Sequence, residues 1–189
     1  GAPYLTIYKA LTVAASGDVI RVGPGTYAED TGAGYLAINR TFSSYVHIVP
    51  DNGDTSSVII TGTSGDRVLM MQGCGFIRFY GLRIRSHSSS VVRVIQFDRT
   101  ALNNIEFDDC QIEILGQSGT VNIGVRDAWS SGDTITQSTV HFINCRWRQF
   151  GPHAVVGVSL NKPTANMTCS NWRFINPDIR TGEYAMRLI

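Results

Sequence analysis

The sequence contains little charge and almost no charge imbalance. Only 16% of its 189 residues are charged, and 16 Lys and Arg oppose 15 Asp and Glu, so the net charge is +1. This balance predicts neither a nucleic acid nor a membrane as partner. No apolar run reaches the roughly 20 residues of a membrane-spanning helix, and no signal peptide heads the chain. We therefore expect residues 1–189 to form one globular or solenoid domain.

Signatures of metal and disulfide chemistry are also missing. The four cysteines and four histidines form no Cys-x-x-Cys motif and no His cluster, so we predict no metal site and no cofactor. A chain of this length builds a core without cross-links, and Cys110 and Cys145 are expected to be buried free thiols. Glycine is abundant, with 19 residues, and Ser, Thr and Asn are frequent. That composition favours an all-β extracellular or virion protein.

An internal repeat organises the chain. In each copy two apolar residues flank a variable one, two turn residues follow, and the same triplet then returns. The copies are IRFYGLRI from Ile77, IEFDDCQI from Ile105, VHFINCRW from Val140 and MTCSNWRF from Met167. The steps between them are 28, 35 and 27 residues, a period that indicates a repeat architecture.

Each copy predicts two short strands joined by a sharp bend, because apolar residues alternate on both sides of the turn residues. The second turn residues are Gly81, Asp109, Asn144 and Asn171, all of types that accept a positive φ. We expect Asn144 and Asn171 to stack in an amide ladder. A third strand precedes three of the copies, at residues 91–97, 121–125 and 154–160. Three strands per coil of roughly 30 residues predict an all-β chain that forms a right-handed parallel β-helix of about six coils.

The two ends of the predicted solenoid differ. Residues 1–16 predict a cap, because Thr6–Ala15 has the apolar spacing of a short amphipathic helix. Such a helix would close the apolar end of the coils, which occupy residues 17–189. Tyr184–Ile189 resembles the opening strand of a further coil. We therefore expect a truncation after this strand, or a partner that covers it.

The segment after this helix, Gly17–Glu29 or GDVIRVGPGTYAE, resembles the first coil of the pectin lyase-like superfamily. That group includes pectate lyases, pectin methylesterases, polygalacturonases and bacteriophage tailspikes. The resemblance implies the fold and says little about activity, because the motif forms the first turn and not a catalytic site. The Asn-Thr-Asp and Gly-His-Gly patterns of polygalacturonases are absent, as are the later methylesterase segments and the calcium-binding Asp set of pectate lyases.

The outward positions of the first strand form one candidate site. Equivalent positions carry Arg78, Glu106, His141 and Thr168. An Arg–Glu–His ladder offers acid/base chemistry. The alternative, which we favour, is a solvated ladder in which unlike charges are neighbours.

The outward positions of the second strand form a basic stripe. Its five arginines are Arg83, Arg85, Arg146, Arg148 and Arg173. They predict a site that binds an anionic polysaccharide or an acidic partner. In the alternative interpretation the arginine stems only cover the sheet, with Glu113 bridging Arg85 and Arg148.

Carboxylates beside the third strand form the last candidate site. Polysaccharide hydrolases and lyases of this superfamily use carboxylates in a groove there, and glycosidic hydrolysis needs a pair roughly 5 to 10 Å apart. Asp98 and Asp127 both follow this strand on neighbouring coils, so they are the predicted catalytic pair. Trp129 and His153 lie on the same side and are predicted to bind a sugar ring, with simple packing as the alternative for Trp129.

These features favour a structural or adhesive β-helix. We expect a bacteriophage virion component, such as a tailspike, fibre or capsid-decorating protein, that binds a polysaccharide or another virion protein. Its location would be a virion or the extracellular space, and its form a homotrimer. The alternative is a polysaccharide lyase or glycoside hydrolase that uses Asp98 and Asp127. A glycan-binding module along the arginine stripe is a third hypothesis.

Overall fold

A computed structural model describes residues 4–88, 93–97, 101–115, 122–127, 135–150, 155–160, 167–180 and 184–188 of the chain. Within these ranges, the side chains of residues 122–127, 135–138, 150, 155–160, 167–170 and 184–188 are not described.

The chain forms one short helix, α1 (Ile7–Val13), and three parallel sheets of six strands each. Sheet A contains β1 (Val19–Val22), β4 (Thr41–Pro50), β7 (Gly75–Tyr80), β10 (Leu102–Asp108), β13 (Ile135–Ile143) and β16 (Met167–Ile175). Sheet B contains β2 (Gly25–Glu29), β5 (Val58–Gly62), β8 (Arg83–Arg85), β11 (Gln111–Leu115), β14 (Arg146–Phe150) and β17 (Asp178–Arg180). Sheet C contains β3 (Leu36–Ile38), β6 (Arg67–Met71), β9 (Arg93–Phe97), β12 (Asn122–Asp127), β15 (Val155–Leu160) and β18 (Tyr184–Leu188).

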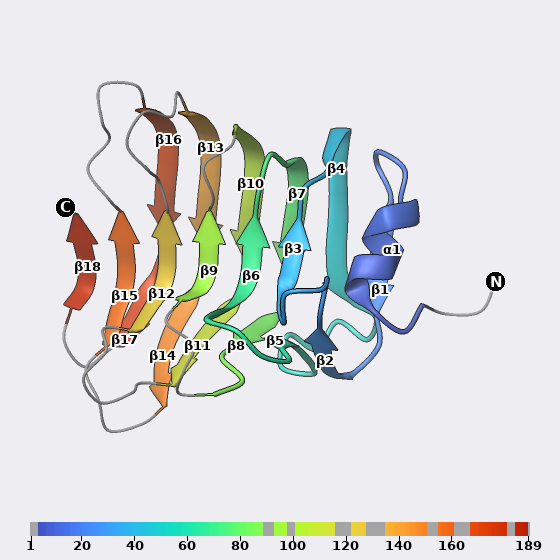
Figure 1. Ribbon diagram of the computed structural model, residues 1–189, viewed down its shortest axis with the longest axis horizontal. Coiled ribbons are helices and arrows are strands. Elements are labelled where there is room, and N and C mark those ends of the chain that lie inside the picture. The colour runs from blue at the N-terminus through green and yellow to red at the C-terminus, as the bar shows by residue number, and fades with distance from the viewer. Residues whose placement is uncertain are drawn as a thin grey trace.

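Successive strands follow the sheets in the order A, B, C. Each strand pairs with its equivalents in the preceding and following coils, and the strands of the first and last coils have one such neighbour. The ribbon runs from α1 at one end to β18 at the other, with the strands of each sheet side by side (Figure 1). This is a parallel β-helix, so the predicted fold class is confirmed. The predicted third strand is confirmed as well, in β9, β12 and β15.

The bend between sheets A and B repeats with the same backbone conformation. Gly81, Asp109, Asn144 and Asn176 have φ values of 64°, 50°, 52° and 48°. The fourth member is therefore Asn176, and the prediction of Asn171 for this position is wrong. The side-chain amide of Asn176 donates to Oδ1 of Asn144 at 3.2 Å, which forms the expected amide contact with a different residue.

The cause is the register of β16 on β13. Val140 lies opposite Trp172 and Phe142 opposite Phe174, so the equivalent of Val140 is five positions beyond Met167. Thr168 therefore lies opposite Thr136 and not beside His141. Cys169 lies opposite Gln137, out of line with Cys145.

Sheet A has a second column of positive φ that the sequence does not predict. Phe76, Asn104, Thr139 and Asn171 have φ values of 57°, 52°, 57° and 60°. Neighbouring register pairs align these residues across β7, β10, β13 and β16. A phenylalanine and a β-branched threonine are unusual in this conformation. The column thus repeats at the same point of these four strands, and on β4 the register shifts between Thr41 and Val46.

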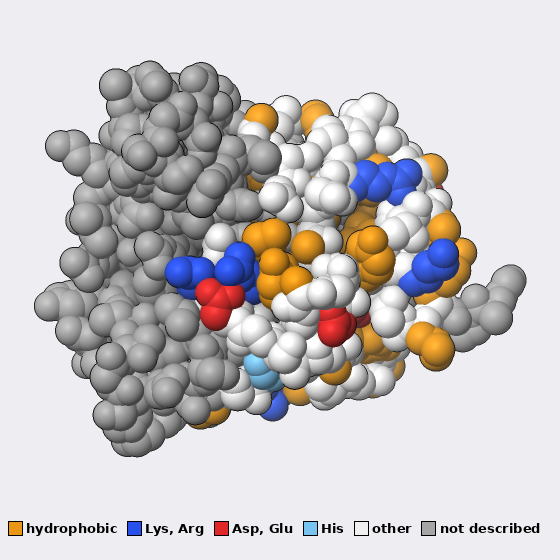
Figure 2. Space-filling model, viewed as in Figure 1, with side chains coloured by type: hydrophobic (Ala, Val, Ile, Leu, Met, Phe, Trp, Pro, Cys, Tyr) orange, Lys and Arg blue, Asp and Glu red, His pale blue; other side chains and the backbone are white. Residues whose placement is uncertain are grey.

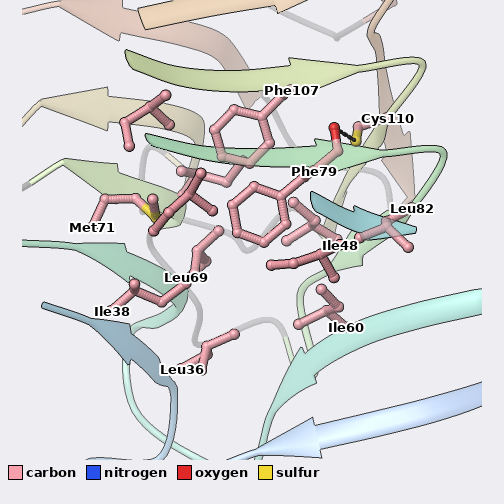
Figure 3. Close-up of a cluster of buried hydrophobic side chains, with 14 of the residues drawn as sticks. Leu36, Ile38, Ile48, Ile60, Leu69, Met71, Phe79, Leu82, Phe107 and Cys110 are labelled. Atoms are coloured by element: carbon pink, nitrogen blue, oxygen red, sulfur yellow. Dashed lines mark hydrogen bonds between the residues drawn. The ribbon is translucent and has the colours of Figure 1, made fainter. Parts of the chain in front are cut away.

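The core contains a column of stacked aromatic rings. The centroids of Phe79, Phe107, Phe142 and Phe174 are 4.8, 4.9 and 5.2 Å apart, with planes within 5° of parallel. Figure 3 shows Phe79 and Phe107 stacked above the aliphatic side chains of the earlier coils. Cys74, Cys110 and Cys145 are buried free thiols, as expected. The side chain of Cys169 lies outside the described residues.

Helix α1 closes the first coil. Thr6 is its N-cap, and Ile7, Leu11 and Ala14 are buried against the core. The carboxylate of Glu29, only 1% exposed, accepts hydrogen bonds from the backbone N–H groups of Ile7 and Tyr8 at 2.6 and 3.1 Å. The last residue of the GTYAE motif therefore holds the helix on the coil, and the predicted cap is confirmed.

Candidate ligand-binding face

A row of polar side chains crosses the outer face of sheet A. It consists of His47, Arg78, Glu106, His141 and Arg173, each opposite the next in register. We call this set the polar row. Adjacent members lie on strands about 4.7–4.9 Å apart, because each coil adds one strand to the sheet. The bends after β7, β10, β13 and β16 repeat in each coil, so one outward position becomes a continuous line.

Glu106 connects most of the polar row. Its Oε1 accepts a hydrogen bond of 3.0 Å from the hydroxyl of Tyr45 and lies 3.8 Å from Nδ1 of His141. Its Oε2 lies 3.5 Å from Nε of Arg78. Arg78 also donates from Nη2 to Oδ2 of Asp108 at 2.5 Å. The cluster therefore holds two carboxylates, one guanidinium, one imidazole and one phenol in contact.

The cluster is partly enclosed. The side chains of Glu106 and His141 are 18% and 16% exposed, and Arg78 is 32% exposed. Burial, reinforced by the hydrogen bond to Glu106, raises the pKa of Tyr45 above its ordinary value, so its hydroxyl remains a neutral donor. Among the described residues, Nε2 of His141 has no hydrogen-bond partner although it is shielded.

A line of outward side chains, all apolar or aromatic except Asp108, borders the polar row on one side. Tyr80, Asp108, Ile143 and Ile175 are opposite one another in the next outward register. Tyr80 and Ile175 are 40% and 39% exposed. On the other side Phe76 packs edge-on against Tyr45, with ring centroids 5.8 Å apart. The face thus combines hydrogen-bonding groups with exposed rings and aliphatic surface.

The two carboxylates of the cluster share one cationic partner. Glycosidases place their two carboxyl groups in contrasting environments, so that one is protonated and the other ionised. Here Glu106 and Asp108 both contact the same Arg78. Their surroundings therefore do not differ in the way that separates an acid from a base in those enzymes.

The structure places the predicted arginine stripe differently from the sequence pattern. Arg83, Arg85, Arg146 and Arg148 lie on sheet B, in β8 and β14. Arg173 lies on sheet A, opposite His141, so its predicted place in the stripe is wrong. The reason is the same register of β16 that displaces Asn171.

Acidic neighbours accompany these sheet B arginines. Glu113, whose side chain is fully buried, pairs with Arg83 at 2.5 Å and also with Arg85. The predicted bridge from Glu113 is confirmed for Arg85. It is wrong for Arg148, which pairs with Asp178 on the next strand at 2.6 Å. Arg146 pairs with Asp109 at 2.8 Å.

The predicted carboxylate site is only partly within the described chain. Asp98, Trp129 and His153 lie outside the described residues. Asp127 is the last residue of β12, and its backbone is paired with Phe97, the residue before Asp98. Its side chain is not described, so the predicted catalytic pair stays a prediction.

Sequence reasoning found Arg78, Glu106 and His141, and it missed Tyr45, Tyr80 and the role of Asp108. The outward position of His47 could have been predicted from the pattern, because Val46 and Ile48 flank it as inward residues. The position of Tyr45 could not have been predicted, because Tyr45 lies in the irregular part of β4, where the alternation that identifies outward residues is interrupted.

Other kinds of site find no support in the described part of the chain. No group of three or more His, Cys, Asp or Glu side chains there is arranged to hold a metal ion. No helix among the described residues is long and apolar enough to cross a membrane.

The strand topology, the capping helix and the polar face define a parallel β-helix protein. The chain belongs to the family described as "Protein of unknown function (DUF1565)", which matches residues 1–168. No curated protein matches it. Among solved structures, it is similar to a pectin methylesterase mutant in complex with a hexasaccharide, with 11% identity and a TM-score of 0.32, covering 100% of this chain and 90% of that one. At these values the similarity carries no argument about function.

Proposed function

We propose that this protein binds an extended polysaccharide along the outer face of sheet A without cleaving it. The observation that carries the proposal is the polar row, which presents hydrogen-bonding groups at one coil spacing beside the exposed ring of Tyr80. Sugars are held by such a combination, because hydroxyl groups need donors and acceptors while the ring faces pack on apolar surface. A chain of sugars would follow the axis of the solenoid.

The charges favour a neutral glycan. On sheet A the carboxylates of Glu106 and Asp108 contact Arg78, and on sheet C Asp66 pairs with both Arg67 and Arg93. The sheet B arginines have the acidic partners given above. Figure 2 shows the same mixture on one face, where the described basic side chains are scattered among uncharged and apolar ones. An acidic polysaccharide would have to compete with these internal ion pairs.

The experiment is a titration of the protein with neutral and uronic-acid polysaccharides by calorimetry. Tyr80→Ala should weaken binding of a neutral glycan by roughly 2–10-fold, the usual contribution of one aromatic contact. Arg180→Gln is the matched control, because this exposed residue lies on sheet B, away from the proposed site. Binding should change little with salt, since screening acts on charge–charge attraction. Binding only to acidic glycans, with strong salt dependence and no effect of Tyr80→Ala, would refute the proposal.

The finer proposal is a structural or adhesive protein, part of a bacteriophage virion or secreted, that assembles as a homotrimer. Its support is the Gly-, Ser-, Thr- and Asn-rich composition and the absence of the enzyme signatures from the sequence. Binding to another virion protein is the corresponding alternative to a glycan. Light scattering tests the assembly: three times the 20.7 kDa chain mass supports the trimer, and a monomer at all concentrations contradicts it.

A polysaccharide-degrading enzyme is the second candidate function. It is favoured by the proximity of Glu106, Asp108 and His141 on one face. Cleavage of a polysaccharide by the purified protein would establish it. Loss of that cleavage in Asp98→Asn and Asp127→Asn would assign it to the predicted pair, whereas loss in Glu106→Gln alone would assign it to the polar row.

A further inference from the structure

A groove lies between α1 and the first strand of sheet A, at the end of the sheet where Val19 is paired with His47 of the polar row. Its volume is about 730 Å³, within the range of ligand sites in proteins. The helix wall is formed by Thr6, Ile7, Ala10, Val13 and Ala14, and the strand wall by Asp18–Gly23, with Tyr4 and Tyr27 completing the lining.

The strand wall is the open edge of a sheet. β1 is the terminal strand of sheet A and pairs only with β4. The carbonyls of Asp18 and Val22 accept hydrogen bonds from β4 and the residue after it, through the N–H groups of His47 and Asp51. Alternate residues of a parallel strand direct their N–H and C=O groups to the same neighbour. The backbone N–H and C=O groups of Val19 and Arg21 therefore point away from β4, toward the groove.

The side chains that line the groove add little hydrogen-bonding capacity of their own. The hydroxyl of Tyr27 donates to the carbonyl of Gly23 at 2.9 Å. The carboxylate of Asp18 accepts from the N–H of Ala15 at 2.7 Å, and Thr6 Oγ1 accepts from Lys9. What remains for a ligand is the backbone edge of β1 and the guanidinium of Arg21, for which no ion pair occurs among the described residues.

The rest of the groove surface is largely apolar. Tyr4, Val13 and Val19 are 52%, 51% and 51% exposed, and Ile20 and Tyr27 pack partly against the core. An unpaired strand edge beside apolar side chains is the surface to which extended polypeptides add as a further strand. A sugar or a nucleotide would leave the backbone groups of Val19 and Arg21 largely unused.

We propose that this groove accepts an extended segment of a separate protein chain, which adds to the open edge of β1. The segment alternates apolar residues, which pack against Ile20 and Val13, with polar ones, and it carries an acidic residue opposite Arg21. The groove borders the polar row at His47, but this proposal rests on the backbone edge of β1 and not on the side chains of the row, so either proposal can fail without the other.

A displayed library of random heptapeptides, selected against the full chain, tests the proposal. We expect enriched peptides with alternating β-branched residues and one Asp or Glu. Binding of a labelled enriched peptide should slow amide hydrogen exchange at Val19 and Arg21. The variant Val19→Pro removes a groove-directed N–H, while the β4-directed groups of Ile20 and Val22 remain, and an edge position tolerates proline.

Val19→Pro should weaken peptide binding at least tenfold while leaving the thermal midpoint nearly unchanged. Arg21→Glu should shift the enriched peptides from acidic to basic, which a purely apolar surface would not do. The proposal is overturned if no peptide is enriched, if the peptides lack alternation, or if Val19→Pro binds them as well as the parent protein. Self-association that Val19→Pro abolishes would assign the groove to a second copy and overturn the choice of a foreign chain.

Discussion

Replacement of Glu113 by Gln should destabilise the protein clearly. The side chain of Glu113 is fully buried on the outer side of sheet B, where it contacts Arg83 and Arg85 and accepts a hydrogen bond of 2.8 Å from the amide of Gln111. Glutamine keeps the shape, removes the negative charge and turns one acceptor into a donor that faces a guanidinium.

The magnitude follows from the burial of the three charges. Removal of one partner from a fully buried ion pair costs about 3–5 kcal/mol. Arg83 and Arg85 are 22% and 41% exposed, so water still solvates both in part and the loss is smaller. We expect a decrease of about 2–3 kcal/mol in the free energy of unfolding. For a chain of this length that corresponds to roughly 5–10 °C in the thermal midpoint.

The assay is thermal and urea unfolding followed by circular dichroism, with Glu106→Gln as the matched control. Glu106 is also a strand glutamate beside an arginine, but it is 18% exposed and Arg78 keeps Asp108 as a partner. The control should lose less than about 1 kcal/mol. In a double-mutant cycle, Glu113→Gln and Arg83→Gln should be coupled by more than about 0.5 kcal/mol. Equal stability of Glu113→Gln and the parent protein would refute the reasoning.

Four further changes test other parts of the structure. Burial raises the pKa of the Glu29 carboxyl from 4.5, so the folded parent protein binds this proton more tightly than the unfolded chain does. The parent therefore loses stability as the pH rises through the window above 4.5. Glu29→Gln should flatten this pH dependence in unfolding titrations. Phe142→Ala, in the middle of the aromatic stack, should lower the free energy of unfolding by about 3–5 kcal/mol in urea titrations. Asn176→Ala should cost about 1–2 kcal/mol, because alanine resists a positive φ, whereas Asn176→Gly should be better tolerated, and equal midpoints for the two would contradict the bend geometry. Burial raises the pKa of Cys74 to about 12 and that of Cys145 above its ordinary value. Thiol reagents should therefore modify neither cysteine in the native protein. Modification at the rate of the unfolded chain would show that the thiols are accessible.

Local pattern determined the individual elements. Alternation in the copies beginning at Ile77 and Ile105 identified which residues point inward, and Phe79 and Phe107 are fully buried as that pattern requires. The turn residues Gly81 and Asp109 adopt the positive φ that their types favour. The spacing around Leu11 predicted the capping helix.

Only the tertiary structure decided how the coils align. Met167 and Trp172 both open segments that read as the repeat, and the pairing of β16 on β13 selects Trp172. In both alignments Trp172 and Phe174 face the core, so alternation of period two specifies their face but not the coil position to which they belong. That shift carries Arg173 from the predicted basic stripe to the polar row.

The candidate site divides in the same way. The sequence by itself determined that Arg78, Glu106 and His141 form a ladder, because they hold one position of three regular repeats. Tyr45 joins it through the irregular stretch of β4, and Glu113 takes Arg83 and Arg85 as partners. These contacts depend on the distances between side chains of different coils. Such distances are fixed only when the coils pack, because the repeat encodes each strand and not its neighbours.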